Sequence, residues 1–268
     1  MSRVTEAHHI GAPGAGGRLR LLLANDDGID APGLHALEAA LAGLGEVTTV
    51  APATEQSARS HALTFHEPLR VRSVGERRFS VSGTPADCIY LALHHLLDAP
   101  PDVVVSGINR GSNLGNDVHY SGTVAAAREA CLAGFSAVSV SLHLEPGDRE
   151  RHWGTAGAVA ARVVRQVLGE RLPPLVHLNV NVPNVPASDV LGLRACTLGR
   201  RTYAPSVVQR RDPRGRRYFW IGGEHEHFGE DDQTDGIAVE RGWASVTPIC
   251  AYPTHHESLE ALRDWTDA

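Results

Sequence analysis

The sequence predicts an α/β fold: a mainly parallel β-sheet with helices on both faces. Short apolar runs rich in β-branched residues alternate with segments of helical periodicity, and this alternation is typical of βαβ crossover units. The chain has 268 residues, of which 42% are hydrophobic and 21% are charged. That length and composition are typical of a water-soluble globular protein with one large domain, or one domain with an appendage.

The first strand and helix follow directly from the pattern of apolar residues. Residues 21–24 form a short apolar strand, and the helix after it begins near Pro32. The helix carries an apolar stripe at spacings of three and four, formed by Leu34, Leu37, Leu41 and Leu44. Gly45 marks its end, and residues 46–52, EVTTVAP, follow as a second buried strand.

A hairpin and a capped helix come next. Residues 69–74 and 79–83 alternate in polarity around the turn sequence GERR, which is typical of a β-hairpin. A helix is expected over residues 84–97, where Thr84 is the N-cap and Asp87 stands three residues later. This spacing is close to that of a capping box.

Three more strands and two more helices complete the core. Strands are expected at residues 102–107, 136–142 and 175–183, each as an apolar run of strand length. Helices are expected at residues 121–134 and 153–169, between these strands. Strands separated by helices of this length imply parallel pairing.

The periodicity ends after Pro183. Residues 186–268 are expected to form hairpins and arms packed on the core, after a dispensable leader (1–18) and a catalytic core (19–185). The segment after Pro183 has little helical periodicity and ends in the apolar and aromatic run of residues 242–253, GWASVTPICAYP, so it is expected to pack against another subunit. One part of this extension is crowded with arginine: Arg200, Arg201, Arg210, Arg211, Arg214, Arg216 and Arg217.

Composition excludes several classes of partner. A formal net charge of −6 argues against a nucleic-acid polymer, because neutralising phosphates requires a basic face. The apolar runs are far too short to span a membrane, and the N-terminus lacks the apolar segment of a signal peptide. The four cysteines have no CxxC spacing, which indicates reduced thiols in a cytoplasmic protein.

Three polar segments leave strands at what should be the same edge of the sheet. Asp26 and Asp27 follow the first strand, residues 51–64 follow the second, and residues 106–123 follow the 102–107 strand. In a parallel sheet, ligands bind beyond the carboxyl ends of the strands. The Asp-Asp-Gly sequence alone is also explained by a polar turn, but a turn does not explain two further long polar loops.

The side chains at this edge favour a hard divalent cation. Carboxylate, amide and hydroxyl oxygens are the ligands that Mg²⁺, Mn²⁺ and Ca²⁺ prefer, and no HExxH or paired CxxC motif indicates zinc. Beside them, Ser121, Gly122 and Thr123 begin a helix, whose free N–H groups and dipole form a phosphate-binding site. Asn113, in the third loop, is a further candidate for substrate binding. The sequence contains no Walker motif, and no GxGxxG follows the first strand.

The combined motifs resemble those of the SurE survival-protein nucleotidases, from about Leu21 to Ile249. The motifs are NDDG with APG, AP....S, SGTPADC, PDVVVSGINRGSNLG, YSGTVAAAREA, LNVNVP and TDGIAVERGWASVTPI. The resemblance implies a Rossmann-like α/β core whose C-terminal part builds homodimers or homotetramers. It also implies a phosphomonoesterase that hydrolyses nucleoside 5′-monophosphates, with 3′-nucleotides and short polyphosphate as further substrates. By the same resemblance, one Mg²⁺ or Mn²⁺ per subunit, with Ca²⁺ as an alternative bound ion, is held by Asp26, Asp27, Ser57 and Asn109.

The expected chemistry is metal-assisted hydrolysis, with Asp26 and Asp27 as the catalytic carboxylates. Either of them could take the proton from the attacking water, and the sequence does not distinguish the two. A phospho-aspartyl route is the rival mechanism, although it usually shows carboxylates at alternate rather than adjacent positions. A nucleotide-sensing module without turnover is the rival function, and release of phosphate from AMP or GMP separates it from an enzyme.

Overall fold

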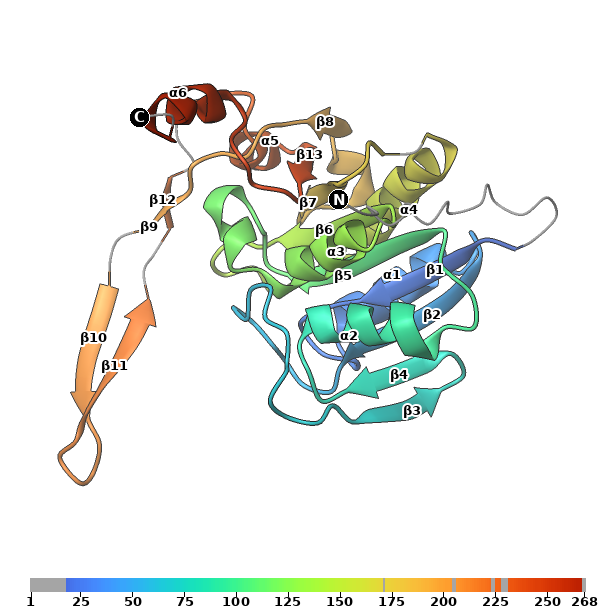
Figure 1. Cartoon of the computed structure of the whole chain (residues 1–268), viewed down its shortest axis with the longest axis horizontal. Helices are drawn as coiled ribbons and strands as arrows, with labels where there is room; N and C mark the ends of the chain where they lie inside the picture. The colour runs from blue at the N-terminus through green and yellow to red at the C-terminus, as the bar shows by residue number, and fades with distance from the viewer. Residues whose placement is uncertain (1–17, 171, 204–205, 223–224, 228–230, 267–268) are drawn as a thin grey trace.

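The candidate site is carried by a nine-stranded sheet at the centre of the molecule (Figure 1). The computed structural model describes residues 18–266, except 171, 204–205, 223–224 and 228–230, so the expected leader lies outside the described residues but for Arg18. Six neighbouring strands run parallel, in the order β4, β2, β1, β5, β6 and β7. The strands in spatial order are β3 (Val71–Gly75), β4 (Arg78–Val81), β2 (Glu46–Pro52), β1 (Arg20–Ala24), β5 (Val103–Arg110), β6 (Ala137–His143), β7 (Val176–Pro183), β13 (Ala244–Cys250) and β8 (Leu193–Ala195).

Helices cover both faces of the sheet, which confirms the predicted α/β architecture. Helices α1 (Pro32–Leu41) and α4 (Trp153–Gly169) pack on one face over a core that includes Leu21, Leu34 and Val140. Helices α2 (Pro85–Leu91) and α3 (Gly122–Leu132) pack on the other, over Leu22, Val104 and Ile89. Within the described residues, no helix has the length and apolar character needed to cross a membrane.

Local sequence signals place most of the element ends. The capping box of α2 is confirmed: the Thr84 hydroxyl accepts the Asp87 N–H at 3.1 Å, and the Asp87 carboxylate accepts the Thr84 N–H at 2.8 Å. The helix expected over 84–97 is regular only to Leu91 and continues as a π-helical turn, η1 (Ala92–Leu96). The hairpin around GERR is confirmed as antiparallel β3 and β4.

The apolar run near the C-terminus extends the main sheet. Ala244–Cys250 form β13, which pairs antiparallel with β7, so this part of the segment expected to contact another subunit also pairs within the chain. β13 also pairs with β8, so the extension contributes two strands to the main sheet. Its other elements are η3 (Ala187–Asp189), β9 (Thr202–Tyr203), β10 (Ser206–Arg211), β11 (Arg217–Gly222), β12 (His225–His227), α5 (Asp235–Glu240) and α6 (Glu257–Thr266).

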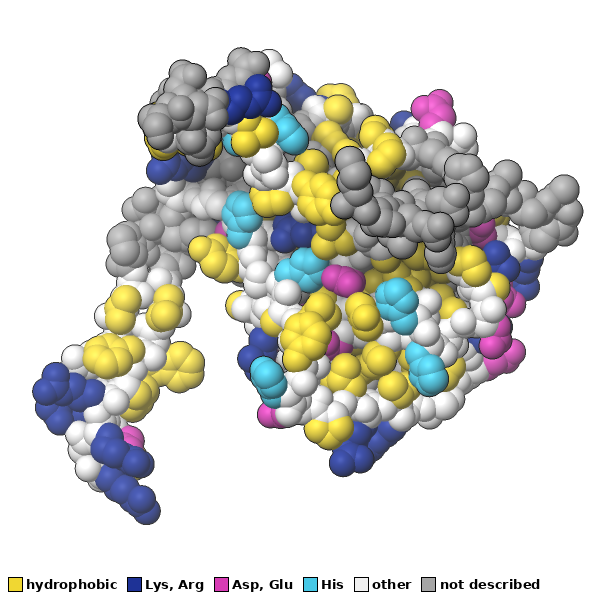
Figure 2. All heavy atoms as spheres, viewed as in Figure 1, with side chains coloured by type: hydrophobic (Ala, Val, Ile, Leu, Met, Phe, Trp, Pro, Cys, Tyr) yellow, Lys and Arg dark blue, Asp and Glu magenta, His cyan; other side chains and the backbone are white. Residues whose placement is uncertain are grey.

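A two-stranded arm projects from the body of the molecule. Strands β10 and β11 pair antiparallel and extend away from the main sheet (Figure 1). The arm carries exposed apolar side chains, among them Phe219, Trp220 and Ile221, which is 90% exposed. Basic side chains gather at its tip (Figure 2). A lone hairpin is marginally stable in water, and an exposed apolar patch of this kind is typical of an interaction surface.

One face of β6, β7 and β13 is polar although it is buried. Ser139 lies opposite Asn179, and Asn179 lies opposite Thr247, in one row across the three strands. On β7, His177 points to the same face because it is two residues from Asn179. His177 is fully buried, and neither of its ring nitrogens has a hydrogen-bond partner among the described residues.

The buried imidazole is expected to make the protein sensitive to acid. Burial and, to a smaller extent, the nearby Arg128 and His61 side chains lower the pKa of His177 from 6.5 to about 3. Between these two values the unfolded chain binds a proton that the folded chain excludes. The free energy of unfolding should therefore fall as pH falls from 6.5 towards 3, by about 1.4 kcal/mol per pH unit from this residue.

Urea denaturation of wild type and His177→Leu across this range measures the effect. The difference in unfolding free energy between the two proteins should change with pH at that slope. The exposed His256→Leu serves as the control and should follow the wild type. If the unfolding free energies of His177→Leu and wild type changed with pH in parallel, the pKa of His177 would not be lowered in the folded protein.

Candidate active site

The three polar loops predicted at one edge of the sheet are brought together there. β1 lies between β2 and β5, so the carboxyl ends of these strands are adjacent. The Asp26–Asp27 turn leaves β1, the loop of residues 53–64 leaves β2, and residues 109–121 continue from the end of β5. The Gln56 N–H donates to the Asp26 carbonyl at 2.7 Å, which ties the first two loops together.

Asp26 is held by the first turn of α3. Its carboxylate accepts the Thr123 N–H at 3.1 Å on Oδ2, and the Thr123 hydroxyl donates to Oδ1. The residue is only 4% exposed. The pKa of Asp26 is raised to about 6: burial raises it most, the Thr123 hydroxyl lowers it, and the negative charge of Asp27 raises it. A carboxylate placed in this way is costly without a compensating positive charge.

Asp27 is more accessible and has different partners. Its Oδ2 atom accepts the Arg110 N–H at 2.9 Å, which joins the β1 turn to the end of β5. Burial raises the pKa of Asp27, and the Arg110 N–H and charge lower it, whereas the nearby Glu55 raises it. Asp26 and Asp27 therefore lie in neighbouring but distinct environments. Asp26 is buried at the start of α3, and Asp27 is partly exposed beside the Arg110 N–H.

Ser57 lies on the loop that follows β2, beside a third carboxylate. Its hydroxyl donates to Glu55 Oε1 at 2.8 Å, and the residue is exposed. The backbone of the next residue, Ala58, is left-handed with φ of 57°, an unusual conformation for a residue with a Cβ. Glu55 lies close enough to raise the pKa of Asp27, so Ser57 and Asp27 belong to one cluster.

The Ser57 loop is fixed at its far end by α2 and α3. The Asp87 carboxylate accepts the Thr64 N–H at 2.9 Å and the Thr64 hydroxyl at 2.6 Å. His61 pairs with Glu129 of α3 at 2.7 Å. The SGTPADC motif thus anchors the loop through Asp87, in addition to capping α2.

Asn109 stands at the end of β5, one residue before the group that binds Asp27. Its side-chain nitrogen donates to the Gly111 carbonyl at 2.8 Å, which orders the side chain in the turn. Asn109 is partly buried. The four predicted metal ligands therefore come from three adjacent strand ends.

Asn113 is buried in a network with the polar face of the sheet. Its side-chain nitrogen donates to the Ser141 hydroxyl at 2.8 Å, and its N–H donates to Asn181 Oδ1 at 2.8 Å. Its carbonyl accepts from the side chains of Asn179 and Asn181 at 2.8 and 3.0 Å. These contacts give Asn113 a part in anchoring the loop after β5.

The predicted phosphate-binding residues contact Asp26 and the helix itself. Ser121 is the N-cap of α3 and accepts the Val124 N–H at 3.1 Å. Thr123 uses both its N–H and its hydroxyl on Asp26. A Cβ added to Gly122 would lie 2.9 Å from the Asp26 Cβ, so this glycine allows the carboxylate to approach the helix.

The side chains at this edge fit a hard divalent cation. Two adjacent carboxylates, a hydroxyl and an amide are oxygen donors, and the repulsion between Asp26 and Asp27 is the kind that a cation removes. The buried Oδ1 atom of Asn25, directly after β1, and the buried Oγ atom of Ser106, within β5, have no hydrogen-bond partner among the described residues. No group of three His, Cys, Asp or Glu side chains in the described chain is arranged as a metal site.

Three residues have roles in this site that the sequence alone did not predict. Glu55 lies two residues before Ser57 in the same loop, and this proximity could have indicated that it lies near the site. Thr123 was expected to bind phosphate rather than Asp26, and the contact joins residues 97 positions apart. Asp87 was expected only to cap its helix, and nothing local indicates its second role.

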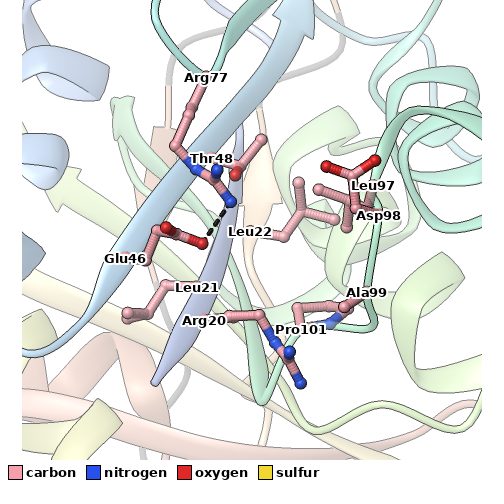
Figure 3. A pocket seen from close by; sticks show the side chains of 10 residues that line it. All are labelled: Arg20, Leu21, Leu22, Glu46, Thr48, Arg77, Leu97, Asp98, Ala99 and Pro101. Atoms are coloured by element: carbon pink, nitrogen blue, oxygen red, sulfur yellow. Dashed lines mark hydrogen bonds and ion pairs between the residues drawn. The ribbon is translucent and has the colours of Figure 1, made fainter. Parts of the chain in front are cut away.

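A cavity lies at the opposite edge of the sheet. It has a volume of about 210 Å³ and is lined by Arg20, Glu46 and Arg77, near the amino ends of β1, β2 and β4 (Figure 3). Arg77 and Glu46 form an ion pair across it (Figure 3). This cavity contains none of the predicted site residues, and its basic and acidic side chains are balanced.

Comparisons with known proteins identify the family of the chain. Residues 21–205 match the family described as survival protein SurE. The chain is 45% identical to "5'-nucleotidase SurE" of Pelobacter propionicus over 92% of this chain and 99% of that protein. It is 47% identical to the protein of the same name from Geobacter sulfurreducens, covering 92% and 94% of the two chains.

A solved structure gives the same result. The crystal structure of the SurE protein from Aquifex aeolicus superposes with a TM-score of 0.83 at 37% identity, over 92% of this chain and all of that one. The Asp26–Asp27 turn and the residues that surround it all fall inside the region that matches the family. The chain belongs to the survival protein SurE family.

Proposed function

We propose that this protein is a 5′-nucleotidase, a phosphomonoesterase that hydrolyses nucleoside 5′-monophosphates to a nucleoside and inorganic phosphate. The observation that carries the proposal is the Asp26–Asp27 pair, fixed where three loops meet, in a chain 45% to 47% identical to proteins named 5′-nucleotidase SurE. Nucleoside 5′-monophosphates are the main substrate class, and 3′-nucleotides and short polyphosphate are further candidates.

A divalent cation would be held by Asp26, Asp27, Ser57 and Asn109, as one Mg²⁺ or Mn²⁺ per subunit. The adjacency of their loops and the set of oxygen donors support this assignment, and Ca²⁺ fits the same donors. When bound, the ion supplies Lewis-acid stabilisation of the phosphate and a lowered pKa for the attacking water. Its charge would also offset that of the two carboxylates in a protein whose formal net charge is −6.

Asp26 and Asp27 would have different roles. Both Asp26 oxygens accept hydrogen bonds from Thr123, so this carboxylate is fixed in place and suited to orienting a ligand. Asp27 has one oxygen bonded to the Arg110 N–H and is more exposed, which favours it as the group that takes the proton from the attacking water.

The phosphate group of the substrate would bind beside the start of α3. Ser121 and Asp26 use the N–H groups of Val124 and Thr123, which leaves Gly122 as the first-turn amide best placed to donate to a phosphate. The positive end of the helix dipole acts on the same region. Asn113 would support the site indirectly, by anchoring the loop after β5 through its bonds to Ser141 and Asn181.

The arm would form a homodimer or homotetramer, and the protein would act in the cytoplasm. Support for assembly comes from the exposed apolar side chains of β10 and β11, which are typical of an interaction surface. Support for location comes from the four cysteines, which are all free thiols. Disulfides are rare in the cytoplasm.

Replacing Asp26 by Asn should abolish most activity. The substitution keeps the size of the side chain but removes its charge and places an NH₂ group against the Thr123 donors. The expected loss in kcat is roughly a thousandfold or more, with weaker binding of Mg²⁺ or Mn²⁺. Phosphate release from AMP and isothermal titration with Mn²⁺ measure the two effects.

The matched control for this substitution is Asp30→Asn. Asp30 lies four residues along the same loop, and its side chain is 84% exposed. This variant should keep the activity and metal dependence of the wild type. Wild-type activity that survives exhaustive chelation, together with an active Asp26→Asn enzyme, would overturn the metal assignment.

Replacing Gly122 by Val should damage the metal site as well as phosphate binding. The new Cβ would lie 2.9 Å from the Asp26 Cβ, so the carboxylate has to move. Both kcat/KM for AMP and the affinity for Mn²⁺ should fall. Gly154→Val, in the first turn of α4 where an added Cβ meets open space, is the control. Loss of activity with unchanged Mn²⁺ affinity would instead assign Gly122 to the phosphate alone.

Charging the arm should separate the subunits. Ile221→Asp places a carboxylate on the apolar surface of β11, which should lower the mass measured by light scattering at micromolar concentration. Arg214→Asp, between β10 and β11 at the tip of the arm, is the control for added negative charge. A wild type that is monomeric and fully active would contradict the proposed assembly.

A further inference from the structure

One segment donates hydrogen bonds to both candidate metal-binding carboxylates. We call residues 109–123 the donor loop. The Arg110 N–H, at its beginning, donates to Asp27, and the N–H and hydroxyl of Thr123, at its end, donate to Asp26. The position of the donor loop therefore sets the relative position of the two carboxylates, and its middle must be held by something.

Asp235 of the C-terminal extension holds the middle of the donor loop. Its fully buried carboxylate accepts the Gly115 N–H at 2.9 Å on Oδ2. Its Oδ1 atom accepts the N–H groups of Gly199 and Gly236 at 2.8 and 2.9 Å. One oxygen thus binds the donor loop, and the other binds the extension.

Close packing reinforces this contact. Gly115 has a left-handed φ of 53°, and an added Cβ would lie only 2.5 Å from the Gly199 carbonyl oxygen. Next to it, the buried Leu114 packs against Val239 and Ile237 of α5. The donor loop therefore sits directly on the helix that Asp235 begins.

Arg201 makes a second connection at the base of the arm. The Arg201 N–H donates to Asn116 Oδ1 at 3.1 Å, and the Asn116 side-chain nitrogen donates to the Arg201 carbonyl at 2.9 Å. The Arg201 guanidinium also donates to Asp117 at 2.6 Å. Two segments of the extension, far from the loop in sequence, thus hold three consecutive residues of it.

We infer that Asp235 is a positioning residue for phosphoester hydrolysis, because it fixes the donor loop that aligns Asp26 and Asp27. This inference rests on the proposed nucleotidase function. Asp235 does not touch the candidate metal ligands, so it acts through the Gly115 N–H and the loop. The C-terminal extension is then part of what makes the site competent, in addition to its role in the sheet.

The substitution Asp235→Asn tests this connection selectively. The Asn side-chain oxygen can still accept the N–H groups of Gly199 and Gly236. Its NH₂ group then faces the Gly115 N–H, and no hydrogen bond forms there because both groups are donors. The bond to the donor loop is lost, and the two bonds within the extension remain. Asn116→Ala is a second variant at an exposed position, which removes the side-chain bonds to the Arg201 backbone without changing the core.

Hydrogen exchange and kinetics on the full-length protein give two independent measurements. Without added metal, Asp235→Asn should speed amide exchange in peptides that cover residues 109–123, while β1, β5 and β6 stay protected. With Mn²⁺, kcat/KM for AMP should fall by about 10- to 100-fold, mainly through kcat, because the carboxylates are misaligned. Asn116→Ala should change both measurements in the same direction, to a smaller extent.

The control is Asp232→Asn. Asp232 lies three residues earlier in the extension, where its carboxylate bonds to Arg241 at 2.7 Å. This variant should stay within about twofold of the wild type in both measurements.

Each contrary outcome has a definite meaning. Unchanged loop exchange and unchanged kcat/KM in Asp235→Asn would overturn the inference while leaving the nucleotidase function intact. Faster amide exchange throughout the core strands would show that Asp235 contributes to the stability of the whole fold, and this result would also overturn the inference. A wild type that releases no phosphate from AMP would defeat the proposed function, and this inference with it.

Discussion

The contact between Asp26 and the first turn of α3 is the constraint on which the rest of the site depends. It places a carboxylate with 4% exposure at the positive end of a helix, where the N–H and hydroxyl of Thr123 bind both of its oxygens. Gly122 is required beside it, because any side chain there would meet Asp26. The neighbouring Asp27 can then remain partly exposed. Two adjacent carboxylates are tolerated because the protein gives each of them a different environment.

The same chemical device is used three times around the site. Asp26, Asp87 and Asp235 are buried carboxylates that accept backbone N–H groups from segments distant in sequence. Hydrogen bonds to a charged acceptor are stronger than neutral ones, so one side chain can hold a neighbouring segment in place. Asp87 holds the Ser57 loop, and Asp235 holds the middle of residues 109–123. Each of these segments is thereby tied to a helix.

The C-terminal extension is part of the core. β13 joins the sheet next to β7, and α5 packs against the loop that follows β5. The arm of β10 and β11 starts shortly after Arg201, which contacts that loop. The base of the arm and the loop that binds both carboxylates are therefore in direct contact, although they are far apart in sequence.

The sequence by itself determined the order of the parallel strands and helices, the capping of α2 and the loops that carry Asp26, Asp27, Ser57 and Asn109. These features depend on local periodicity, on short-range capping and on the rule that parallel strands share a carboxyl edge. Only the tertiary structure decided that Thr123 binds Asp26, that Asp235 holds Gly115 and that residues 244–250 pair with β7. Thr123 lies 97 residues from Asp26, and Asp235 lies 120 residues from Gly115. No local preference encodes such partners, because long-range contacts are chosen by the packing of the whole chain.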